Sequence, residues 1–347
     1  MRFDKSGWFN RLEKTINEIR LDHDFFIYLI EIGEIKFQVV VEKNALFNKA
    51  IEAFYASSII QELIVSIPVI YCVDQNLASE IIRGAGREII SSNFYQDNKR
   101  FEEKYIVMND VSRSCIKALN VKKGLGLFAC QDFKNLPSWE FFSPLKEFIH
   151  LIALQSDCWL AHGGSIVDKH KGILFVGPGK SGKSSTTISL ISHQMKTAGD
   201  DYVCLSKDYK VYAIYRTIKH KGDRFTQFLD YLKEYETSLD AQSQKTVYFC
   251  NRVSEEGPFV DSFELKSIYG LELTLESMQK MLVSDDLKFN YFFMTTASQI
   301  PLWIDQSMKL ASLIFKKIDK KFIVLPTDDA SHHDFLNFLT KNIHESY

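Results

Sequence analysis

Several features that would define a protein class are absent from this sequence. Proline is scarce, with 7 in 347 residues, and no low-complexity tract or internal repeat occurs, so long proline linkers and repeat arrays are excluded. No window reaches the ~18 uninterrupted apolar residues of a membrane-spanning helix, so we expect no membrane partner. The net charge is −2, so no strong positive field indicates nucleic acid as a partner.

The six cysteines form no recognisable motif. None belongs to a Cys-x-x-Cys pair, and none lies in a short His/Cys cluster of the kind that binds zinc. Dispersed cysteines in a chain of this size predict reduced, mostly buried thiols. The first ten residues carry Arg2, Asp4 and Lys5 and lack the apolar core of a signal peptide. We therefore expect a cytoplasmic protein.

The composition that is present fits a densely packed globular protein. Hydrophobic residues make up 46% of the chain and charged residues 25%, which allows a sizeable core. The length suits one large domain or two ordinary ones. A polar stretch at residues 131–137 ends in Pro137 and indicates a boundary. We therefore divide the chain into an N-terminal α+β domain at residues 1–135, a candidate for substrate recognition, and a catalytic domain at residues 136–347.

Hydrophobic periodicity predicts the elements of the first domain. The spacing of Trp8, Leu12, Ile16 and Ile19 predicts an amphipathic helix. Two strands are expected within residues 25–41 on either side of Gly33. The remaining expected elements are a helix at 45–57 and strands at 64–73, 105–108 and 124–130. No chemistry can be assigned to this part of the chain.

The second domain alternates between strands and helices, which predicts an α/β sheet with helices laid against it. Strands are expected at residues 159–167, 172–176, 202–205, 210–215, 245–250, 263–273 and 321–325. Helices are expected at residues 138–155, 183–193, 225–235 and 334–343, and residues 275–315 are expected to be mostly helical.

A phosphate-binding loop is the strongest signal in the sequence. Residues 177–184 match the pattern G-x-x-x-x-G-K-S/T, after an apolar strand and before a helix. Glycines let backbone N–H groups surround phosphate oxygens, and the helix N-terminus adds partial positive charge. Lys183 would bind the terminal phosphates and the Ser184 hydroxyl would bind Mg²⁺. The predicted nucleotide-binding residues are Gly177, Gly179, Lys180, Ser181, Gly182, Lys183, Ser184 and Ser185.

An acidic pair follows one helix after the loop. Asp200 and Asp201 directly precede the strand predicted at residues 202–205, which places two carboxylates beside the triphosphate. One carboxylate can deprotonate an attacking hydroxyl, and the other can hold Mg²⁺ or a neighbouring group. The Asn-Lys-x-Asp run that reads a guanine base is absent. This absence favours ATP over GTP.

A third motif completes the pattern. His162-Gly163 lies one strand upstream of the loop and leads into an apolar run that ends at Val167. The order His-Gly, strand, P-loop, helix and Asp-Asp resembles the HPr kinase/phosphorylase family. It is also similar to the shorter HPr-kinase-like proteins of bacterial biosynthetic clusters, including kinases that tailor lasso peptides. The runs at residues 198–203 and 211–219 are especially similar to this second group, and the resemblance covers residues 159–219.

The resemblance implies a fold and a set of roles. The fold would be an α/β P-loop kinase domain of the HPr kinase and phosphoenolpyruvate carboxykinase type, preceded by a smaller α+β domain. Asp200 matches the family's catalytic base, which takes the proton from the accepting serine. Asp201 matches its neighbour, which supports the metal and the histidine, and His162 matches the active-site histidine. With Lys183 these are the four predicted catalytic residues, and Ser184 and Asp201 are the predicted metal ligands.

The sequence also departs from the family pattern. Ser185 stands where the kinase/phosphorylases usually carry Glu, and Lys180 occupies a position that is usually small. The later Glu-Ile-Arg-Gly signature has no convincing copy, because the nearest run, at residues 263–266, lacks both Arg and Gly. These departures argue against phosphorylase activity and against HPr as the acceptor. They leave ATP-dependent phosphoryl transfer intact.

Other polar residues have ordinary explanations. Arg216 and Lys219 either face the triphosphate or an acidic substrate, or end a strand in solvent. The pair His332-His333 before Asp334 lacks a nearby third ligand and favours a capped helix start over a metal site. The aromatic run at residues 289–294 favours core packing.

The sequence therefore predicts an ATP- and Mg²⁺-dependent kinase that phosphorylates a serine-type hydroxyl of a peptide or small protein. Two alternatives stay open. One is a kinase for a small molecule such as free serine or a sugar. The other is a nucleotide-binding switch protein that transfers no phosphate. True HPr kinases form hexamers, so a homo-oligomer is compatible with the resemblance.

Overall fold

The computed structural model describes most of the chain. Described are residues 25–43, 45–74, 106–110, 114–169, 171–220, 236–240, 245–250, 257–274, 280–283 and 302–326, with residues 14, 78–79, 296, 299–300, 336–337 and 339–341. The predicted helix at residues 225–235, the aromatic run at 289–294 and the pair His332-His333 lie outside the described residues, as does the first predicted helix apart from residue 14. The chain forms two compact units: unit 1 is residues 1–52 and 56–144, and unit 2 is residues 53–55 and 145–347.

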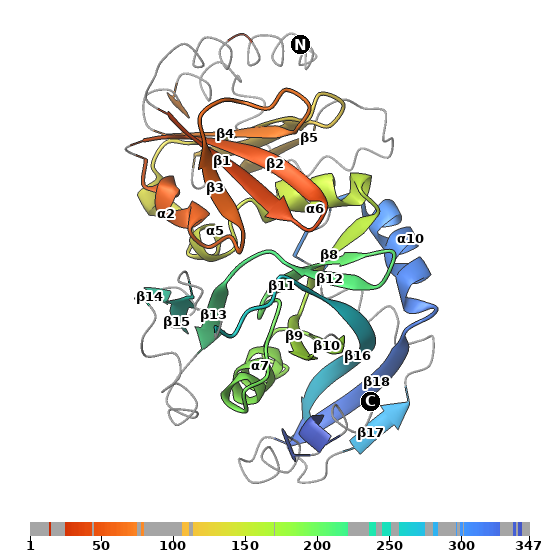
Figure 1. The fold of residues 1–347 in the computed structure, drawn as a ribbon. Helices are drawn as coiled ribbons and strands as arrows, with labels where there is room; N and C mark the ends of the chain where they lie inside the picture. Colours follow the sequence, from red (N-terminus) through yellow and green to blue (C-terminus); the bar gives the residue numbers. More distant parts are fainter. Residues whose placement is uncertain are drawn as a thin grey trace. The chain divides into compact units, whose positions relative to one another are not determined.

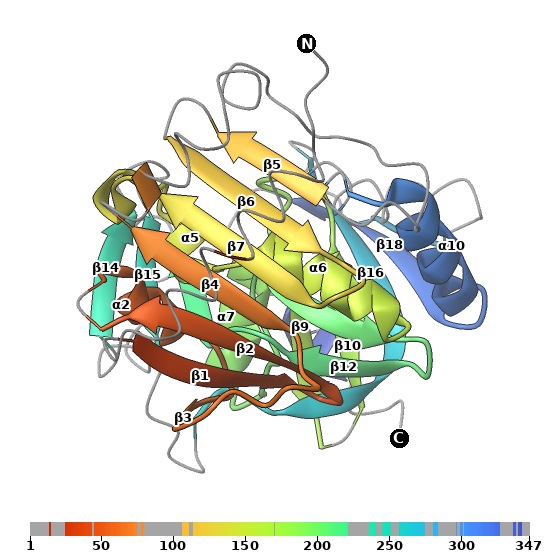
Figure 2. The ribbon, with the colours of Figure 1, turned by 90° about the horizontal axis from the view of Figure 1, so that it is seen from above.

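Unit 1 is built on one seven-stranded sheet, with the strand order β3-β1-β2-β4-β7-β6-β5 (Figure 2). Its strands are β1 (Phe25–Ile32), β2 (Ile35–Glu42), β3 (Ser57–Ile60), β4 (Val69–Asp74), β5 (Ile106–Asp110), β6 (Cys115–Asn120) and β7 (Leu125–Cys130). The pairs β2–β4 and β4–β7 are parallel, and the other pairs are antiparallel. The sheet is therefore mixed.

Local sequence explains the elements of unit 1 that were predicted. Strands β1 and β2 form a hairpin in which Gly33 adopts φ 60°, a backbone angle that glycine tolerates without strain. The short helix α2 (Phe47–Ile51) buries Phe47 against Phe128 of β7, with ring centroids 5.4 Å apart. Phe133, in the 3-10 turn η2 (Phe133–Asn135), stacks on Phe47 at 5.0 Å.

Three predictions in unit 1 are wrong. The helix predicted at residues 45–57 is confined to Phe47–Ile51, and strand β3 begins at Ser57. Strand β4 begins at Val69 instead of residue 64, since Pro68 has no N–H for a strand ladder. Cys115 and Cys130 are directly opposite in the β6–β7 ladder and form a disulfide, which corrects the expectation of six reduced thiols. Strand β6 was not predicted.

Unit 2 contains an eight-stranded sheet and a three-stranded sheet (Figure 1). The large sheet runs β17-β18-β16-β12-β11-β8, and β10 pairs with both β16 and β9. Its strands are β8 (Cys158–His162), β9 (Gly164–Asp168), β10 (Lys171–Val176), β11 (Tyr202–Ser206), β12 (Lys210–Ala213), β16 (Ser262–Thr274), β17 (Lys280–Val283) and β18 (Asp319–Pro326). The small sheet has the order β13-β15-β14, with β13 (Thr217–His220), β14 (Glu236–Asp240) and β15 (Lys245–Phe249).

The long strand β16 organises the large sheet. It pairs in parallel with β10 on one side and with β18 on the other. Parallel strands covered on both faces carry continuous apolar runs, and Phe175, Ile268 and Leu271 are fully buried here. Helix α7 (Lys183–Ser192) contributes Ile188 and Leu190 to the same core. This packing holds the end of β10 and the start of α7 in one place.

Helices in unit 2 differ from the prediction at two points. The single helix expected at residues 138–155 is divided into α5 (Trp139–Phe142), which belongs to unit 1, and α6 (Lys146–Gln155). Pro144 lies between them and cannot continue a helix, because its ring blocks the preceding turn. The stretch expected to be mostly helical contains strand β17 and then helix α10 (Ile304–Phe315). No helix in the described part of the chain is long and apolar enough to cross a membrane.

One strand prediction in unit 2 is also corrected. The strand expected at residues 159–167 is two strands, β8 and β9, which separate at Gly163. They have different partners, since β8 pairs with β11 and β9 pairs with β10. Strand β13 was not predicted. Both units combine helices with mixed sheets, and the combination agrees with an α/β protein.

Candidate active site

The predicted phosphate loop connects β10 to α7. Gly177 follows the last residue of β10 and has φ 157°, and Gly182 caps α7 with φ 94°. A Cβ atom on Gly177 would lie 2.5 Å from the carbonyl oxygen of Leu271 and would also collide with the Ser181 hydroxyl. Gly179, in contrast, has open space on the side where a Cβ would stand. The backbone of Lys180 has φ 67°, so even a residue with a long side chain takes the left-handed backbone conformation in this loop.

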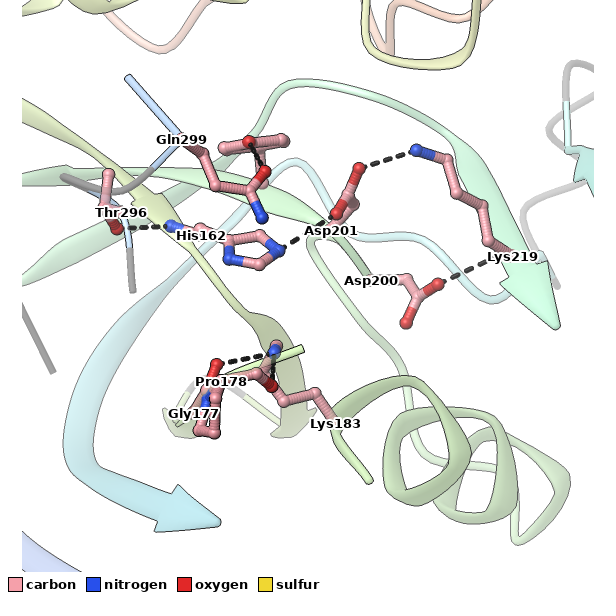
Figure 3. A network of polar contacts seen from close by, with 10 residues as sticks. His162, Gly177, Pro178, Lys183, Asp200, Asp201, Lys219, Thr296 and Gln299 are labelled. Atoms are coloured by element: carbon pink, nitrogen blue, oxygen red, sulfur yellow. Dashed lines mark hydrogen bonds and ion pairs between the residues drawn. The ribbon is translucent and has the colours of Figure 1, made fainter. Parts of the chain in front are cut away.

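Lys183 is folded over this loop. Its ammonium group donates hydrogen bonds to the carbonyl oxygens of Gly177 at 2.7 Å and Pro178 at 2.9 Å (Figure 3). Burial lowers the pKa of Lys183 to about 8, although the nearby Asp201 and Asp200 act in the opposite direction. Among the residues that the structure describes, no carboxylate pairs with this ammonium, and a buried cation of this kind favours an anionic ligand.

The acidic pair sits on a rigid loop directly before β11. The carbonyl oxygen of Gly199 accepts hydrogen bonds from the Ser165 backbone N–H at 2.8 Å and from the Thr197 hydroxyl at 3.1 Å. The Gly163 N–H donates to the carbonyl oxygen of Asp201 at 2.9 Å. The turn between β8 and β9 is thereby fastened to the backbone of the acidic pair.

Asp201 is the centre of a charged network. Its Oδ2 accepts a hydrogen bond from the ammonium of Lys219 at 2.6 Å, and its Oδ1 lies 3.3 Å from Nε2 of His162 (Figure 3). Burial raises the pKa of Asp201, but Lys219 and His162 together outweigh burial and hold the pKa well below its usual range. Asp201 is therefore an ionised carboxylate with both oxygens engaged.

Asp200 has the opposite character. It is 2% exposed, and its Oδ2 accepts a hydrogen bond from the backbone N–H of Lys219 at 2.9 Å. Burial raises its pKa, and the charge of Asp201 raises it further, against the lowering effect of that hydrogen bond. Within the described residues, Oδ1 of Asp200 makes no hydrogen bond of standard length and angle. The Ser184 side chain approaches the carboxyl closely enough to lower its pKa.

His162 ends β8 and is held from several sides. Its backbone N–H donates to the Thr296 hydroxyl at 2.8 Å. Its ring lies against the Tyr202 ring, with centroids 5.1 Å apart, and the Tyr202 hydroxyl donates to Oε1 of Gln299 at 2.6 Å. The pairing of Tyr202 with His162 in the β8–β11 ladder explains the ring contact. These contacts orient the imidazole toward Asp201.

The structure brings the four predicted catalytic residues, His162, Lys183, Asp200 and Asp201, into one site (Figure 3). All of them belong to unit 2.

Ser184, predicted to bind metal, lies beside Asp200, whereas the oxygens of Asp201 contact Lys219 and His162. Ser181 is buried, and Lys180 is exposed. Across the described residues, no group of three or more His, Cys, Asp or Glu side chains could hold a metal by itself.

Two basic residues left open by the sequence are now distinguished. Lys219 is buried and contacts both members of the acidic pair. Arg216 instead donates from Nε to the carbonyl oxygen of Phe54 at 2.8 Å and lies over the ring of Tyr55. Thr296 and Gln299 were not predicted, because neither belongs to a motif and the contacts depend on the fold.

Comparison with known proteins gives a limited result. No protein-family profile matches the sequence, and no curated protein is significantly similar to it. Among solved structures, the Hpr(Ser) kinase/phosphatase from Coxiella burnetii matches with 11% sequence identity and a TM-score of 0.26, over 54% of this chain and 94% of that one. A TM-score this low assigns neither fold nor activity, so the function must be argued from the site.

Proposed function

We propose that this chain is an ATP- and Mg²⁺-dependent kinase of the HPr-kinase-like type, which transfers the γ-phosphate to a serine-type hydroxyl of a peptide or small protein. One observation carries the proposal. Two adjacent carboxyl groups, Asp200 and Asp201, lie beside the P-loop lysine in environments that shift their pKa values in opposite directions. Such a division suits one group as a proton acceptor and the other as a fixed charge.

The nucleotide would occupy the loop from Gly177 to Ser184. Its backbone N–H groups and the N-terminus of α7 suit an anionic phosphate chain. The ammonium of Lys183, now bonded to the carbonyl oxygens of Gly177 and Pro178, would turn to the terminal phosphates. ATP is favoured over GTP, since no Asn-Lys-x-Asp run occurs in the sequence.

Asp200 would act as the general base. Its Oδ1 is buried and makes no hydrogen bond of standard length and angle within the described residues, so it can accept the proton of an incoming hydroxyl. The acceptor oxygen forms a bond to the γ-phosphorus while the bond between that phosphorus and the β,γ-bridging oxygen breaks. The proton passes to Asp200, and ADP leaves with the bridging oxygen. Atoms and charges balance without any other reactant.

The oxygen atoms near Asp200 also fit a magnesium ion. The Ser184 hydroxyl is a hard oxygen donor of the kind that Mg²⁺ prefers, and no wholly protein-built cage is needed when phosphates complete the shell. Bound there, the ion would neutralise charge on the phosphate oxygens. Ser184 would hold it, while the contacts of Asp201 with Lys219 and His162 leave Asp201 to orient the site.

Lys219 would be a positioning residue for both carboxyl groups. Its ammonium fixes Asp201, and its backbone N–H fixes Asp200. Because both contacts come from one residue of β13, the spacing between the two carboxyl groups is set by the strand. Preorganisation of this kind lowers the barrier to transfer, since no reorientation is needed during the reaction.

The decisive experiment compares the wild-type protein with Asp200→Asn. Each is incubated with ATP and Mg²⁺ and with serine-containing peptides, HPr or free serine, and every acceptor is examined by mass spectrometry. We expect a peptide to gain about 80 Da with the wild type. The variant should lose roughly 10²- to 10⁴-fold in rate while its affinity for ATP persists.

Other outcomes separate the alternatives. Phosphorylation of free serine alone would favour a small-molecule kinase. ATP binding or slow hydrolysis that Asp200→Asn leaves unchanged, with no phosphorylated acceptor, would contradict the kinase proposal and favour a nucleotide-binding switch. Light scattering of the same samples reports whether the protein forms a homo-oligomer.

A further inference from the structure

Lys245 is a basic residue that no motif contains, and it lies beside the candidate site. It is the first residue of β15, the central strand of the three-stranded sheet. Strand β15 pairs with β13 so that Val247 is directly opposite Lys219. Directly opposite residues share a face, and residues two apart on one strand share a face. Lys245 and Lys219 therefore occupy the same face of the sheet as diagonal neighbours, a relation that typically spans about 7–8 Å.

This face of the sheet is directed at the acidic pair. The ammonium of Lys219 lies 2.6 Å from Oδ2 of Asp201, and its backbone N–H lies 2.9 Å from Oδ2 of Asp200. Strand β13 also packs against α7, the helix that begins with Lys183. Electrostatics agree with this placement, because the charge of Lys245 lowers the pKa of both Lys183 and Asp200. The field of Lys245 thus reaches the phosphate loop itself.

Lys245 differs from its neighbours in forming no ion pair with another residue in the described part of the chain. Lys219 is paired with Asp201, and Lys183 donates to two loop carbonyl oxygens. No carboxylate in the described part of the chain forms an ion pair with Lys245. Lys183, Lys219 and Lys245 therefore lie near the acidic pair, in which Asp200 has a raised pKa, and Asp240 is directly opposite Lys245 in the β14–β15 ladder. Close cations repel one another, and a polyanion placed among them removes the repulsion.

We propose that Lys245 is a second phosphate-binding cation, which binds the terminal phosphate of the nucleotide together with Lys183. This inference rests on the nucleotide site of the proposed function and adds a residue from a different sheet to it. Two cations on separate elements would hold the γ-phosphate between them. A lysine acts there as a mobile point charge, whereas the loop amides bind the phosphates nearer the ribose.

The test measures how much each phosphate contributes to affinity. Calorimetry with the full-length protein and Mg²⁺ gives Kd for ATP, ADP and AMP, for wild type and for Lys245→Gln. We expect affinity for ATP to fall about tenfold, affinity for ADP to fall less, and affinity for AMP to stay unchanged, in keeping with a charge-assisted contact to the terminal phosphate. Lys245→Arg should restore most of the preference for ATP.

Lys210→Gln is the matched control, because Lys210 is also the first residue of a strand and is exposed. It should leave all three affinities unchanged. Equal affinities of wild type and Lys245→Gln, or an equal loss for ATP, ADP and AMP, would overturn the inference. If Lys245→Gln selectively weakens ATP but the wild type phosphorylates no acceptor, the kinase proposal fails and the role of Lys245 stands. If phosphate transfer depends on Asp200 while Lys245→Gln binds ATP normally, the kinase proposal stands and the role of Lys245 is contradicted.

Discussion

At the scale of single residues, the site depends on different surroundings for two identical side chains. Asp200 and Asp201 are adjacent in sequence, but Asp200 is 2% exposed and has a raised pKa, whereas Asp201 lies between Lys219 and His162 and has a lowered pKa. Burial costs an ionised group its hydration, and the adjacent ammonium of Lys219 offsets that cost for Asp201. Chemical identity alone therefore does not determine which aspartate accepts a proton.

The raised pKa of Asp200 predicts the pH dependence of phosphate transfer. The base must be ionised, so activity should be lost as the pH falls through the pKa of Asp200. That pKa is raised above the ordinary aspartate value of about 3.9, so the acidic limb of the kcat profile should lie above that value. Because the charge of Asp201 raises the pKa and the charge of Lys245 lowers it, Asp201→Asn should move the limb to lower pH and Lys245→Gln to higher pH.

Both variants can be compared in one series of initial rates across the pH range. A variant with only residual phosphate transfer is sufficient, because the experiment needs only the pH at the midpoint of the acidic limb. Shifts of the same sign in both variants would show that another group is titrating.

At the scale of elements, the join between β10 and α7 determines whether the phosphate loop can form. Gly177 faces the carbonyl oxygen of Leu271 on β16, the parallel neighbour of β10. The loop is thus packed against the sheet at one end and open at Gly179. Two glycines of one motif consequently serve different purposes, one for close packing and one for access by a ligand.

Gly177→Ala and Gly179→Ala should therefore differ in stability. A Cβ at residue 177 would lie 2.5 Å from the Leu271 oxygen, so we expect Gly177→Ala to lose about 1–3 kcal/mol of unfolding free energy. A Cβ at residue 179 meets nothing within 4 Å, so Gly179→Ala should stay within about 0.5 kcal/mol of wild type. Urea titration followed by circular dichroism measures both. Equal midpoints for the two variants would contradict the packing role of Gly177.

At the scale of the whole molecule, the chain forms two compact units, and the candidate active site lies in one of them. Every residue of the site, from His162 to Lys245, belongs to unit 2. Unit 1 has its own mixed sheet and its own aromatic core around Phe47 and Phe128. Its use in recognising a peptide acceptor stays a prediction.

This division predicts where ATP protects the chain. A ligand that binds only the folded state stabilises it by about 2.7 kcal/mol at a hundredfold excess over Kd. Hydrogen exchange should therefore slow in β10, α7, β11 and β13 when ATP and Mg²⁺ are added, and should change little in β1, β2 and β7. ADP serves as the control for the γ-phosphate. Protection confined to unit 1 would contradict the assignment of the nucleotide site.

Local sequence was sufficient for elements whose residues interact with near neighbours. The hairpin at Gly33, strand β10 and helix α7 follow from periodicity and glycine placement, and the structure confirms them. The prediction of one helix at residues 138–155 was wrong, because it followed the apolar residues and did not take Pro144 into account. The missed strands are β3, β6, β13, β14 and β17, since short strands gain their stability from pairing with other strands.

The phosphate loop and the acidic pair could be predicted from the amino-acid sequence, because each is a contiguous motif whose residues need only the neighbouring strand and helix. The rest of the site depends on contacts between elements that are distant in the sequence. Lys219 and Lys245 reach it through the register of β13 with β15, and Thr296 reaches His162 across 134 residues of sequence. The pKa of a carboxyl group follows the charges and the solvent around it, and these are fixed only when distant strands have paired.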